Sequence, residues 1–333
     1  MQKGIHNGLE LPLISIIIPA YNVSPYIGEA LRSVFLQDFK SYEVIVVNDG
    51  STDTPELEKV LEPYRDKIHY ICQENGGISA ARNAALRVAR GELIALLDAD
   101  DVWREGKLTE QLAFMKQGGF DMVYADALLI GDVPWPKGTT FMDRSPSEGP
   151  VTVISLLDMR STVLVSTVIM RKDFVEQVGG FDEEDRNIFS AEDFDLWLRL
   201  ARAGARIGYE KKTLAEYRIR SDSLSASFTK LHEAALSVLQ KTRRNMTLSA
   251  SEKKALDRTE RHLQSIIMLE RGKTMIINGE VAEARAMLAK VRETNSSWKI
   301  LLALLGLRTF PGLVRRYLRK RYHSKPLAPT DAS

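Results

Sequence analysis

Three carboxylates stand close together at the end of a short apolar run. Asp98, Asp100 and Asp101 directly follow residues 93–97. Neighbouring carboxylates repel one another and are costly to desolvate, so we do not expect them in the core. A divalent cation would relieve the repulsion. Hard oxygen ligands favour Mg²⁺ or Mn²⁺, held by one or two carboxylates together with water and phosphate oxygens. An acidic turn before a helix near Glu105 is the alternative interpretation.

A second group of residues could bind an anion. Gly76 and Gly77 would let the backbone approach a ligand just before a helix, and Arg82 in the first turn of that helix could pair with a diphosphate. Gly-Gly before a helix is also ordinary turn sequence. No Walker A sequence and no G-x-G-x-x-G follows the first apolar run, which argues against P-loop NTPases and dinucleotide dehydrogenases.

A third group is the adjacent pair Glu192 and Asp193, which precedes apolar residues at helical spacing over 194–201. A carboxylate in such a position could serve as a general base. The alternative is structural: Ser190 and Asp193 would form a capping box, and the helix dipole would favour the charge of Glu192.

The elements that must position these groups follow from the pattern of the first hundred residues. Short apolar runs alternate with helical patterns, which is typical of βαβ units and a mostly parallel sheet. Ligands of such sheets bind beyond the carboxyl ends of the strands, where the polar segments lie. We predict strands at 14–18, 44–47, 68–71 and 93–97, and helices at 24–35 (capped by Ser24), 57–64 and 79–89 (closed by Gly91).

The rest of the chain changes character twice. Residues 131–150 are rich in Gly and Pro and predict a long loop, and 163–170 predict a further strand. After residue 225 the pattern is helical throughout, and 269–291 is typical of one tetratricopeptide-like helix-turn-helix. We therefore expect an α/β domain at 1–225 and an all-helical region at 226–333.

Composition and charge restrict the setting of the protein. The 333 residues contain 46 basic and 44 acidic side chains, but residues 298–325 hold eight basic residues and no acidic one, so the remainder is net acidic. The single cysteine, Cys72, excludes an internal disulfide framework and a multi-cysteine zinc site, and fits the cytoplasm. No run approaches the roughly 18–20 apolar residues of a membrane span.

The basic tail at 298–325 interleaves apolar and aromatic residues with Arg and Lys. This pattern favours a helix lying in an anionic membrane surface, and we expect peripheral contact with the inner face of the cytoplasmic membrane. A helix packed on the body of the protein is the second interpretation. Nucleic acid binding ranks last, and we expect no nucleic acid partner.

The order of the motifs resembles the family 2 glycosyltransferases, which have the Rossmann-like GT-A fold. The resemblance spans about residues 13–225 and includes Pro19-Ala20-Tyr21-Asn22, Asn48-Asp49-Gly50-Ser51, Asn75-Gly76-Gly77, Asp98-Ala99-Asp100-Asp101, Gly179-Gly180-Phe181-Asp182 and Glu192-Asp193-Phe194-Asp195. It implies an inverting, metal-dependent transfer of a sugar from a nucleotide donor, such as a UDP-sugar, to a glycan or lipid-linked acceptor in surface-polysaccharide synthesis.

Carried over by position, the resemblance assigns a role to each site residue. Pro19 and Tyr21 would contact the base, with Asp49 accepting from the uracil N3–H. Arg82 would lie by the base and diphosphate, Asp98 would lie by the ribose, and Asp100 would bind Mn²⁺ or Mg²⁺. Ala20, Gly76 and Ala99 are further expected nucleotide-sugar-binding positions. Asp193 is the expected catalytic base, with Glu192 beside it.

Two positions depart from the family pattern. Many relatives have a His after Tyr-Arg near the end of this domain, where the present chain has Arg220, which cannot ligate a metal but could pair with phosphate. Asn48 replaces the first carboxylate of the usual Asp-Asp-Gly-Ser. Two alternatives stay open: a phosphatase of the haloacid dehalogenase type, because residues 93–102 also resemble that family's nucleophile loop, and a non-catalytic nucleotide-sugar or glycan-binding module.

Overall fold

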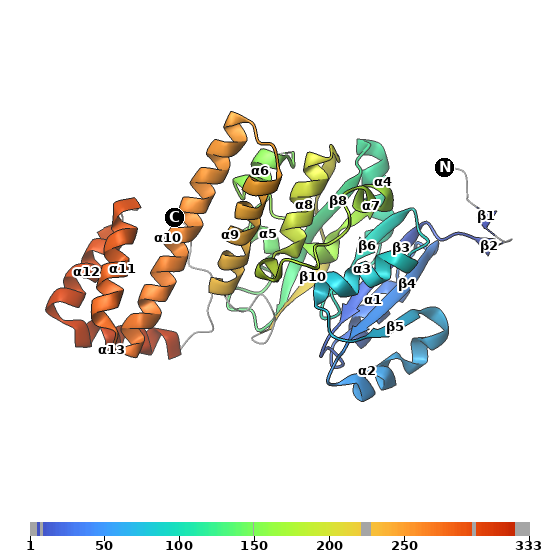
Figure 1. The fold of residues 1–333 in the computed structure, drawn as a ribbon. Helices are drawn as coiled ribbons and strands as arrows, with labels where there is room; N and C mark the ends of the chain where they lie inside the picture. The colour runs from blue at the N-terminus through green and yellow to red at the C-terminus, as the bar shows by residue number, and fades with distance from the viewer. Residues whose placement is uncertain (1–4, 7–8, 149, 221–227, 295–297, 324–333) are drawn as a thin grey trace. The chain divides into compact units, whose positions relative to one another are not determined.

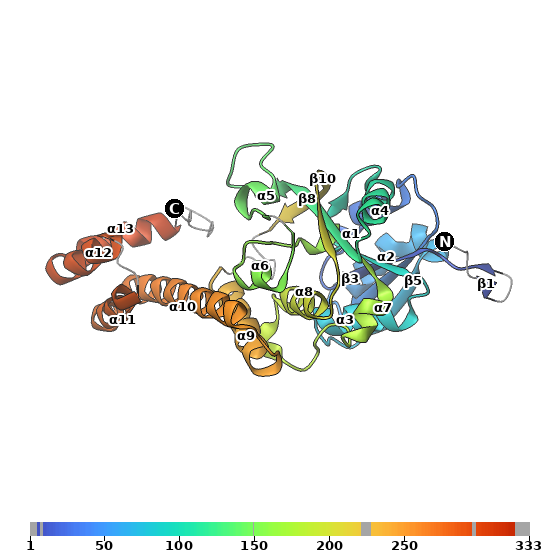
Figure 2. The same ribbon diagram turned by 90° about the horizontal axis from the view of Figure 1, so that it is seen from above.

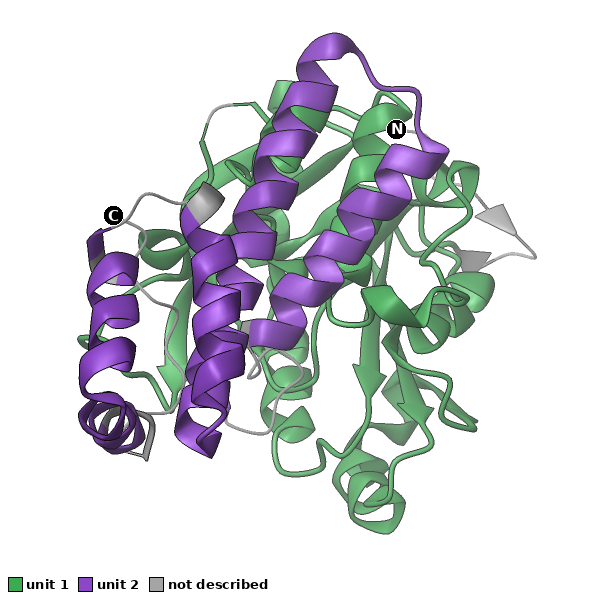
Figure 3. Cartoon of the chain, turned by 60° about the vertical axis from the view of Figure 1, so that its left-hand side comes forward, with its two compact units in different colours: residues 1–219 green, residues 220–333 purple. Residues whose placement is uncertain are grey.

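The structure is a computed structural model, and it describes residues 5–6, 9–148, 150–220, 228–294 and 298–323. The chain divides into two compact units, Met1–Ile219 and Arg220–Ser333 (Figure 3). The predicted domain boundary between residues 225 and 226 lies outside the described residues, so it stays a prediction.

Unit 1 contains an eight-stranded mixed sheet, and a separate two-stranded ribbon of β1 (Ile5–His6) and β2 (Leu9–Glu10) precedes it. In spatial order the strands of the main sheet are β5 (His69–Gln73), β4 (Tyr42–Asp49), β3 (Ile14–Ala20), β6 (Leu93–Leu96), β9 (Ile169–Arg171), β8 (Met122–Gly131), β10 (Ile207–Ile219) and β7 (Val102–Trp103).

The strand directions bring several carboxyl ends to one edge of this sheet. β5, β4, β3 and β6 are mutually parallel, and β10 is parallel to β8. β9 is antiparallel to both of its neighbours, β6 and β8, so β8 again runs in the direction of β6. The polar segments that follow β3, β4 and β6, and Arg220 directly after β10, therefore lie along a common edge, as expected for an α/β ligand site.

Helices cover both faces of the sheet (Figures 1 and 2). Ile14, Ile16 and Ile18 of β3 join one core with α1 and α4, and the two-residue period of a strand turns Ile17 to the opposite face. Figure 2 shows α3, α7 and α8 on that face. The helices of unit 1 are α1 (Ile27–Phe35), α2 (Thr54–Leu61), α3 (Ile78–Val88), α4 (Lys107–Gly118), α5 (Phe141–Arg144), α6 (Val153–Leu157), α7 (Lys172–Gln177) and α8 (Glu192–Arg202).

The four predicted strands of the first hundred residues are confirmed as β3 to β6, but two predicted helix ends are wrong. α1 begins at Ile27 without a side-chain cap, and the Ser24 amide instead donates to Asp53 Oδ2 at 2.9 Å. α3 ends in extended backbone at Ala89, so Gly91 is not its left-handed cap. Gly91 has a different reason to be small: a Cβ there would lie 2.5 Å from the Ser15 amide nitrogen of β3.

The second half of unit 1 differs more from the sequence prediction. The expected strand at 163–170 is wrong for most of its length, because a 3₁₀ turn at Val165–Thr167 precedes the short β9. The Gly- and Pro-rich segment 131–150 includes α5, which Thr140 caps. β8 and β10 were not predicted. The remaining 3₁₀ turns are Glu62–Lys67 and Arg186–Ile188.

All regular secondary structure in the described residues of unit 2 is helical. It comprises α9 (Phe228–Asn245), α10 (Ala250–Asn278), α11 (Val281–Thr294), α12 (Trp298–Thr309) and α13 (Pro311–His323). The predicted helix-turn-helix is confirmed: α10 is followed by Gly279, whose φ of +100° allows the reversal into α11. None of the helices in the described part of the chain is long and apolar enough to span a bilayer.

Candidate functional site

The site begins where β3, β4 and β6 end side by side. Ala20 pairs with Asn48 in register, and Ile17 pairs with Leu96, so the segments after the three strands leave the sheet at one edge. These segments hold Pro19 to Asn22, Asn48 to Asp53 and Asp98 to Asp101. The structure therefore brings together the three polar strand ends that the sequence singled out.

Asp49 organises the loop that leads into α3. Its buried carboxylate accepts from the Gly76 amide at 2.9 Å, the Gly77 amide at 2.8 Å and Gln73 Nε2 at 2.8 Å. Gly77 has a φ of +86° and is the residue before α3. A carboxylate has about four acceptor positions, and three of them are used here. Asp49 thus fixes the predicted anion-binding turn and retains limited capacity for a ligand.

The segment after β3 is tied to the segment after β4. Asn22 adopts a left-handed φ of +54°, and its Oδ1 accepts from the Thr52 amide at 2.8 Å and from Thr52 Oγ1 at 2.9 Å. Ala20 is buried and Pro19 is half-buried, whereas Tyr21 is 49% exposed. Tyr21 is therefore the residue of the predicted base-binding group with a side chain open to a ligand.

Asn48 has a structural role that explains why an amide suits this position. Its fully buried side chain donates to Thr54 Oγ1 and to the Tyr70 hydroxyl, both at 2.9 Å, and accepts from the Ser51 amide at 2.9 Å. An amide can donate and accept together, and an ionised carboxylate only accepts. Asn48 therefore holds the turn after β4 without adding a buried charge.

Arg82 lies at the centre of a buried ionic cluster. The residue stands in the second turn of α3, one turn later than expected, and only 1% of its side chain is exposed. Nη1 donates to Glu192 Oε1 at 2.6 Å, and Nη2 donates to Asp98 Oδ1 at 2.9 Å. These carboxylates raise the pKa of the guanidinium against the effect of burial. The Arg82 side chain, which we expected to lie beside the diphosphate, is thus hydrogen-bonded to two other candidate site residues.

Glu192 and Asp193 begin α8 beside this cluster. Glu192 is buried, and its Oε2 has no hydrogen-bond partner among the described residues. Burial raises the pKa of Asp193 to about 7, and the neighbouring charge of Glu192 acts in the same direction, whereas the charge of Arg82 lowers it. A carboxyl group that titrates near neutral pH can both release and accept a proton there, as a general base requires.

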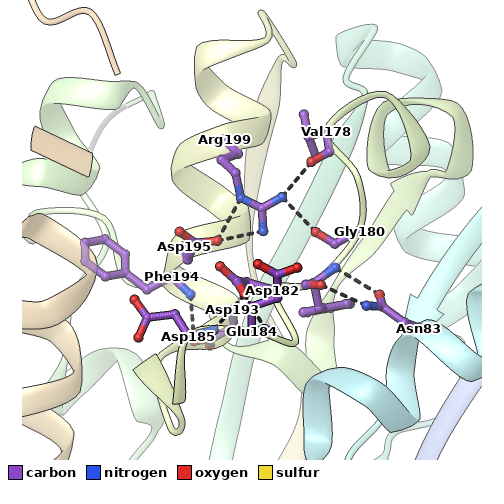
Figure 4. Close-up of polar contacts among 11 residues, drawn as sticks. Asn83, Val178, Gly180, Asp182, Glu184, Asp185, Asp193, Phe194, Asp195 and Arg199 are labelled. Atoms are coloured by element: carbon purple, nitrogen blue, oxygen red, sulfur yellow. Dashed lines mark hydrogen bonds and ion pairs between the residues drawn. The ribbon is translucent and has the colours of Figure 1, made fainter. Parts of the chain in front are cut away.

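A network of polar contacts fixes the position of α8 (Figure 4). Arg199 pairs with Asp195 at 2.7 Å and donates to the carbonyls of Val178 (2.9 Å) and Gly180 (2.7 Å). Asn83 of α3 exchanges two hydrogen bonds with the backbone of Phe181, at 2.8 and 2.9 Å. The motif around Gly179 to Phe181 therefore clamps α8 to α3.

The capping-box alternative for Asp193 is wrong. Ala191, not Ser190, precedes α8, Ser190 has a φ of +78°, and no side-chain cap is present. Asp193 Oδ1 instead accepts from the next amide, that of Phe194, at 2.7 Å. Capping thus does not account for the carboxylates at 192 and 193.

Two residues that the sequence did not reveal, Ser166 and Arg218, hold the loop after β6 in place. Ser166 Oγ donates to Asp101 Oδ2 at 2.5 Å and accepts from the Asp98 amide at 3.1 Å. The backbone amide of Arg218 donates to Asp101 Oδ1 at 2.8 Å, and the side-chain Nε of Arg218 donates to the Asp100 carbonyl at 2.8 Å. Burial raises the pKa of Asp101 well above its usual value, and the charges of Asp100 and Asp98 add to this effect.

The three carboxylates of this loop therefore divide into two kinds. Asp101 is 1% exposed and holds the loop to β10, whereas Asp98 and Asp100 are only half-buried. Arg220 follows β10 directly and is half-buried, two residues beyond the Arg218 contact with this loop. Arg218 could have been found from the sequence, because it belongs to the Tyr217-Arg218 pair used to locate Arg220. Ser166 belongs to the 3₁₀ turn, for which the sequence carried no clear pattern.

The fit of a divalent cation depends on this division. No group of three or more His, Cys, Asp or Glu side chains suited to a metal ion occurs in the described part of the chain. Asp98 and Asp100 fit a different arrangement, in which one or two carboxylates share Mg²⁺ or Mn²⁺ with the phosphates of a ligand. The donor set therefore suits a cation bound together with a nucleotide.

Comparison with known structures supports the fold. The chain is similar to S. aureus TarS 1–349 in complex with UDP-GlcNAc, with a TM-score of 0.57, 22% identity and coverage of 93% of this chain and 91% of the other. It is also similar to the Pyrobaculum calidifontis mannosyltransferase PcManGT in complex with GDP-Man and Mn²⁺, with a TM-score of 0.59, 20% identity and coverage of 94% and 86%. The mixed α/β architecture is thus the expected GT-A fold.

Sequence relatives point to a family. The model of Glycosyl transferase family 2 matches residues 15–174. An uncharacterized glycosyltransferase of Rickettsia conorii is 33% identical over 227 residues, which are 66% of this chain and 36% of that protein. The chain thus spans about a third of the length of this longer relative.

Two relatives of more similar length agree with this match. TuaG of Bacillus subtilis, assigned to teichuronic acid biosynthesis, is 32% identical over 65% of this chain and 82% of its own length. The Escherichia coli β-1,3-glucosyltransferase WfaP, whose name gives UDP-Glc and α-D-GlcNAc-diphosphoundecaprenol, is 30% identical over 65% and 81%. None of the relatives described above is named as a phosphatase. The chain, which carries the ordered motifs on a GT-A fold, belongs to the family 2 glycosyltransferases.

Proposed function

We propose that this protein transfers a sugar from a nucleotide diphosphate sugar, a UDP-sugar by our assignment, to a hydroxyl group of a glycan or lipid-linked acceptor in surface-polysaccharide synthesis. The single observation that carries the proposal is the arrangement at the carboxyl edge of the sheet, where Arg82 joins Asp98 after β6 to Glu192, the neighbour of Asp193, at the start of α8. The donor and acceptor named for WfaP, and the UDP-GlcNAc complex of TarS, support this choice of substrates.

The proposed reaction inverts the configuration at the anomeric carbon. The carboxylate of Asp193 accepts the proton of the acceptor hydroxyl as that oxygen forms a bond to the anomeric carbon. The bond between the anomeric carbon and the diphosphate oxygen breaks on the opposite face, and its electron pair leaves with the nucleoside diphosphate. Glu192 acts on this step by raising the pKa of Asp193.

The donor is proposed to lie along the strand ends. Tyr21 would meet the base, beside Pro19 and Ala20, and Asp49 would offer its remaining acceptor position to the uracil N3–H. Asp98 and Ala99 would meet the ribose. Gly76 would line the backbone turn beside the base. We assign Arg82 as a positioning residue, because its two terminal nitrogens already hold Asp98 and Glu192.

A divalent cation completes the proposed site. Asp100 would hold Mn²⁺ or Mg²⁺, and the cation would stabilise the charge of the departing diphosphate. Arg220 is proposed to offset phosphate charge from the end of β10. The Mn²⁺ named in the PcManGT complex is consistent with such a requirement.

The tail is proposed to bring the enzyme to its acceptor. α12 and α13 expose large apolar and aromatic side chains among basic ones, which suits peripheral contact with the anionic inner face of the cytoplasmic membrane. We accordingly place the protein in the cytoplasm. Each basic residue near an anionic surface contributes about 1 kcal/mol.

Calorimetric titration of the full chain with UDP, with and without Mn²⁺, tests the donor site. We expect cation-dependent binding that Asp100→Ala weakens strongly. Absence of UDP binding by the intact protein, or full binding by Asp100→Ala, would count against the site. A panel of nucleotide sugars in the same assay would then identify the sugar and test the choice of UDP.

The variant Asp193→Asn tests the base. We expect transfer to fall about 10²–10⁴-fold with UDP affinity nearly unchanged, because the amide cannot accept the proton. Loss of UDP binding in this variant would overturn the assignment. A wild-type protein that binds donor but neither transfers nor hydrolyses it would instead fit the non-catalytic module.

A further inference from the structure

Unit 2 contains a groove that the donor site does not use. It lies between α11 and α12, which run side by side (Figure 1). Its volume is about 510 Å³. Three of its lining residues are arginines, Arg285, Arg292 and Arg308, and the others are alanines of α11 and leucines of α12, including Ala286, Ala289 and Leu301. No carboxylate lines it among the described residues.

The three arginine residues are exposed and have no carboxylate partner in the described part of the chain. Arg285 and Arg292 stand seven residues apart on α11, so they share one face of that helix, and Arg308 approaches from the last turn of α12. Within the described part of the chain, none of the three makes a hydrogen bond or an ion pair. Converging like charges repel one another, and an anion with several oxygens would relieve the repulsion through bidentate contacts.

The apolar side of the groove continues onto an exposed apolar face. Ile300, Ala303, Leu304 and Leu307 of α12 face the core of unit 2. Helices that are apolar all round are normally buried, yet the outer face of α12 is open. The exposed large side chains of α12, α13 and their junction are Trp298, Leu302, Leu305, Phe310, Leu313 and Tyr317.

We propose that this groove is a binding site for a lipid that carries a phosphate or diphosphate group, with the phosphate held by the three arginines and the alkyl chain along the alanines and leucines. An aliphatic floor suits an alkyl chain, whereas a site for single-stranded nucleic acid would need aromatic stacking surfaces. The proposal rests on the proposed function in one respect, because a lipid-linked acceptor would bring such a group to the enzyme.

The first experiment distinguishes binding of the phosphate head group from binding of the alkyl chain. The full-length protein is titrated with monododecyl phosphate below its micellar concentration, with inorganic pyrophosphate as the head alone and with dodecyl maltoside as an uncharged chain. We expect saturable binding of monododecyl phosphate, at least about tenfold tighter than either partial ligand. Equal binding of the alkyl phosphate and the maltoside, or no binding of the alkyl phosphate, would overturn the proposal.

Matched variants localise the binding. The groove variant carries Arg285→Gln, Arg292→Gln and Arg308→Gln, and the control carries Arg316→Gln, Arg319→Gln and Lys320→Gln on α13, which removes the same charge outside the groove. We expect the groove variant to lose at least about tenfold in affinity and the control to keep it. Equal losses would mean diffuse attraction and would overturn the site. Ala289→Trp should also block binding, because it fills the groove without changing the charge.

The source of the lipid is decided by two further probes. Farnesyl diphosphate that competes with monododecyl phosphate, together with vesicle binding that the groove variant leaves unchanged, would identify a lipid-linked diphosphate. A selective loss of binding to phosphatidylcholine vesicles containing phosphatidylglycerol would identify a bilayer lipid. Tighter binding of an acidic peptide or oligonucleotide than of monododecyl phosphate would overturn the proposal. UDP affinity is measured in the same preparations. Unchanged UDP binding together with absent lipid binding would mean that the groove proposal fails while the donor site stands.

Discussion

At the scale of single residues, one arginine balances the charges of the candidate site. Arg82 is buried between Asp98 and Glu192, and its positive charge also lowers the pKa of Asp193. The guanidinium group of Arg82 thus supplies positive charge to three carboxylates, those of Asp98, Glu192 and Asp193. Two consequences follow, one for the pH dependence of activity and one for stability.

The pH profile should depend on Glu192. The charge of Glu192 raises the pKa of Asp193, so Glu192→Gln removes that contribution and also frees Arg82 to lower the pKa further. Wild-type kcat/KM should rise with pH through an ionisation near 7, and in Glu192→Gln the same rise should occur at lower pH. A profile that does not move, or that moves upward, would show that a different group titrates.

Loss of Arg82 should be more harmful than loss of the whole ion pair. Arg82→Leu leaves Glu192 buried without its partner, which costs about 3–5 kcal/mol in the free energy of unfolding. The double variant Arg82→Leu/Glu192→Leu removes both charges and should recover part of that loss. Urea denaturation of the two variants provides the measurement, and a double variant less stable than the single one would contradict this account.

At the scale of elements, α8 owes its position to contacts with α3 and with the 178–181 turn. Asn83→Leu removes two hydrogen bonds to the Phe181 backbone, and we expect a loss of about 1–3 kcal/mol in the free energy of unfolding and a lower kcat. Arg87→Gln, one turn further along α3, breaks only an exposed pair with Glu183 at 3.7 Å and should change stability by less than about 1 kcal/mol. Equal effects of the two would contradict the clamp.

The sequence predicted the elements with a clear periodic signal and missed those without one. β3 to β6 and the polar segments after β3, β4 and β6 were predicted, because parallel strands are apolar and end abruptly. The 3₁₀ turn that carries Ser166 has no repeating pattern, and the chain enters α8 without a side-chain cap through a left-handed Ser190, a conformation that serine rarely adopts. The pairing of Arg82 with Glu192 joins residues 110 positions apart, so only the fold could show it.

At the scale of the whole molecule, the nearly neutral total charge conceals an acidic remainder and a basic tail. Association with vesicles containing phosphatidylglycerol should fall steeply between about 0.05 and 0.5 M salt, because screening shortens the reach of surface charges. Sedimentation with the vesicles measures this, and vesicles of phosphatidylcholine alone provide the control. Association with neutral vesicles at the same level would contradict an electrostatic contribution of the tail.

The open apolar face of α12 and α13 also has a consequence for the protein in lipid-free buffer. Trp298 and Leu313 are each 65% exposed, and burying such side chains is favourable whether the cover is a lipid or another molecule. Purified protein should therefore self-associate as its concentration rises, and a mild non-ionic detergent should disperse it. The face that we assign to a membrane would then govern the colloidal behaviour of the enzyme once the membrane is removed.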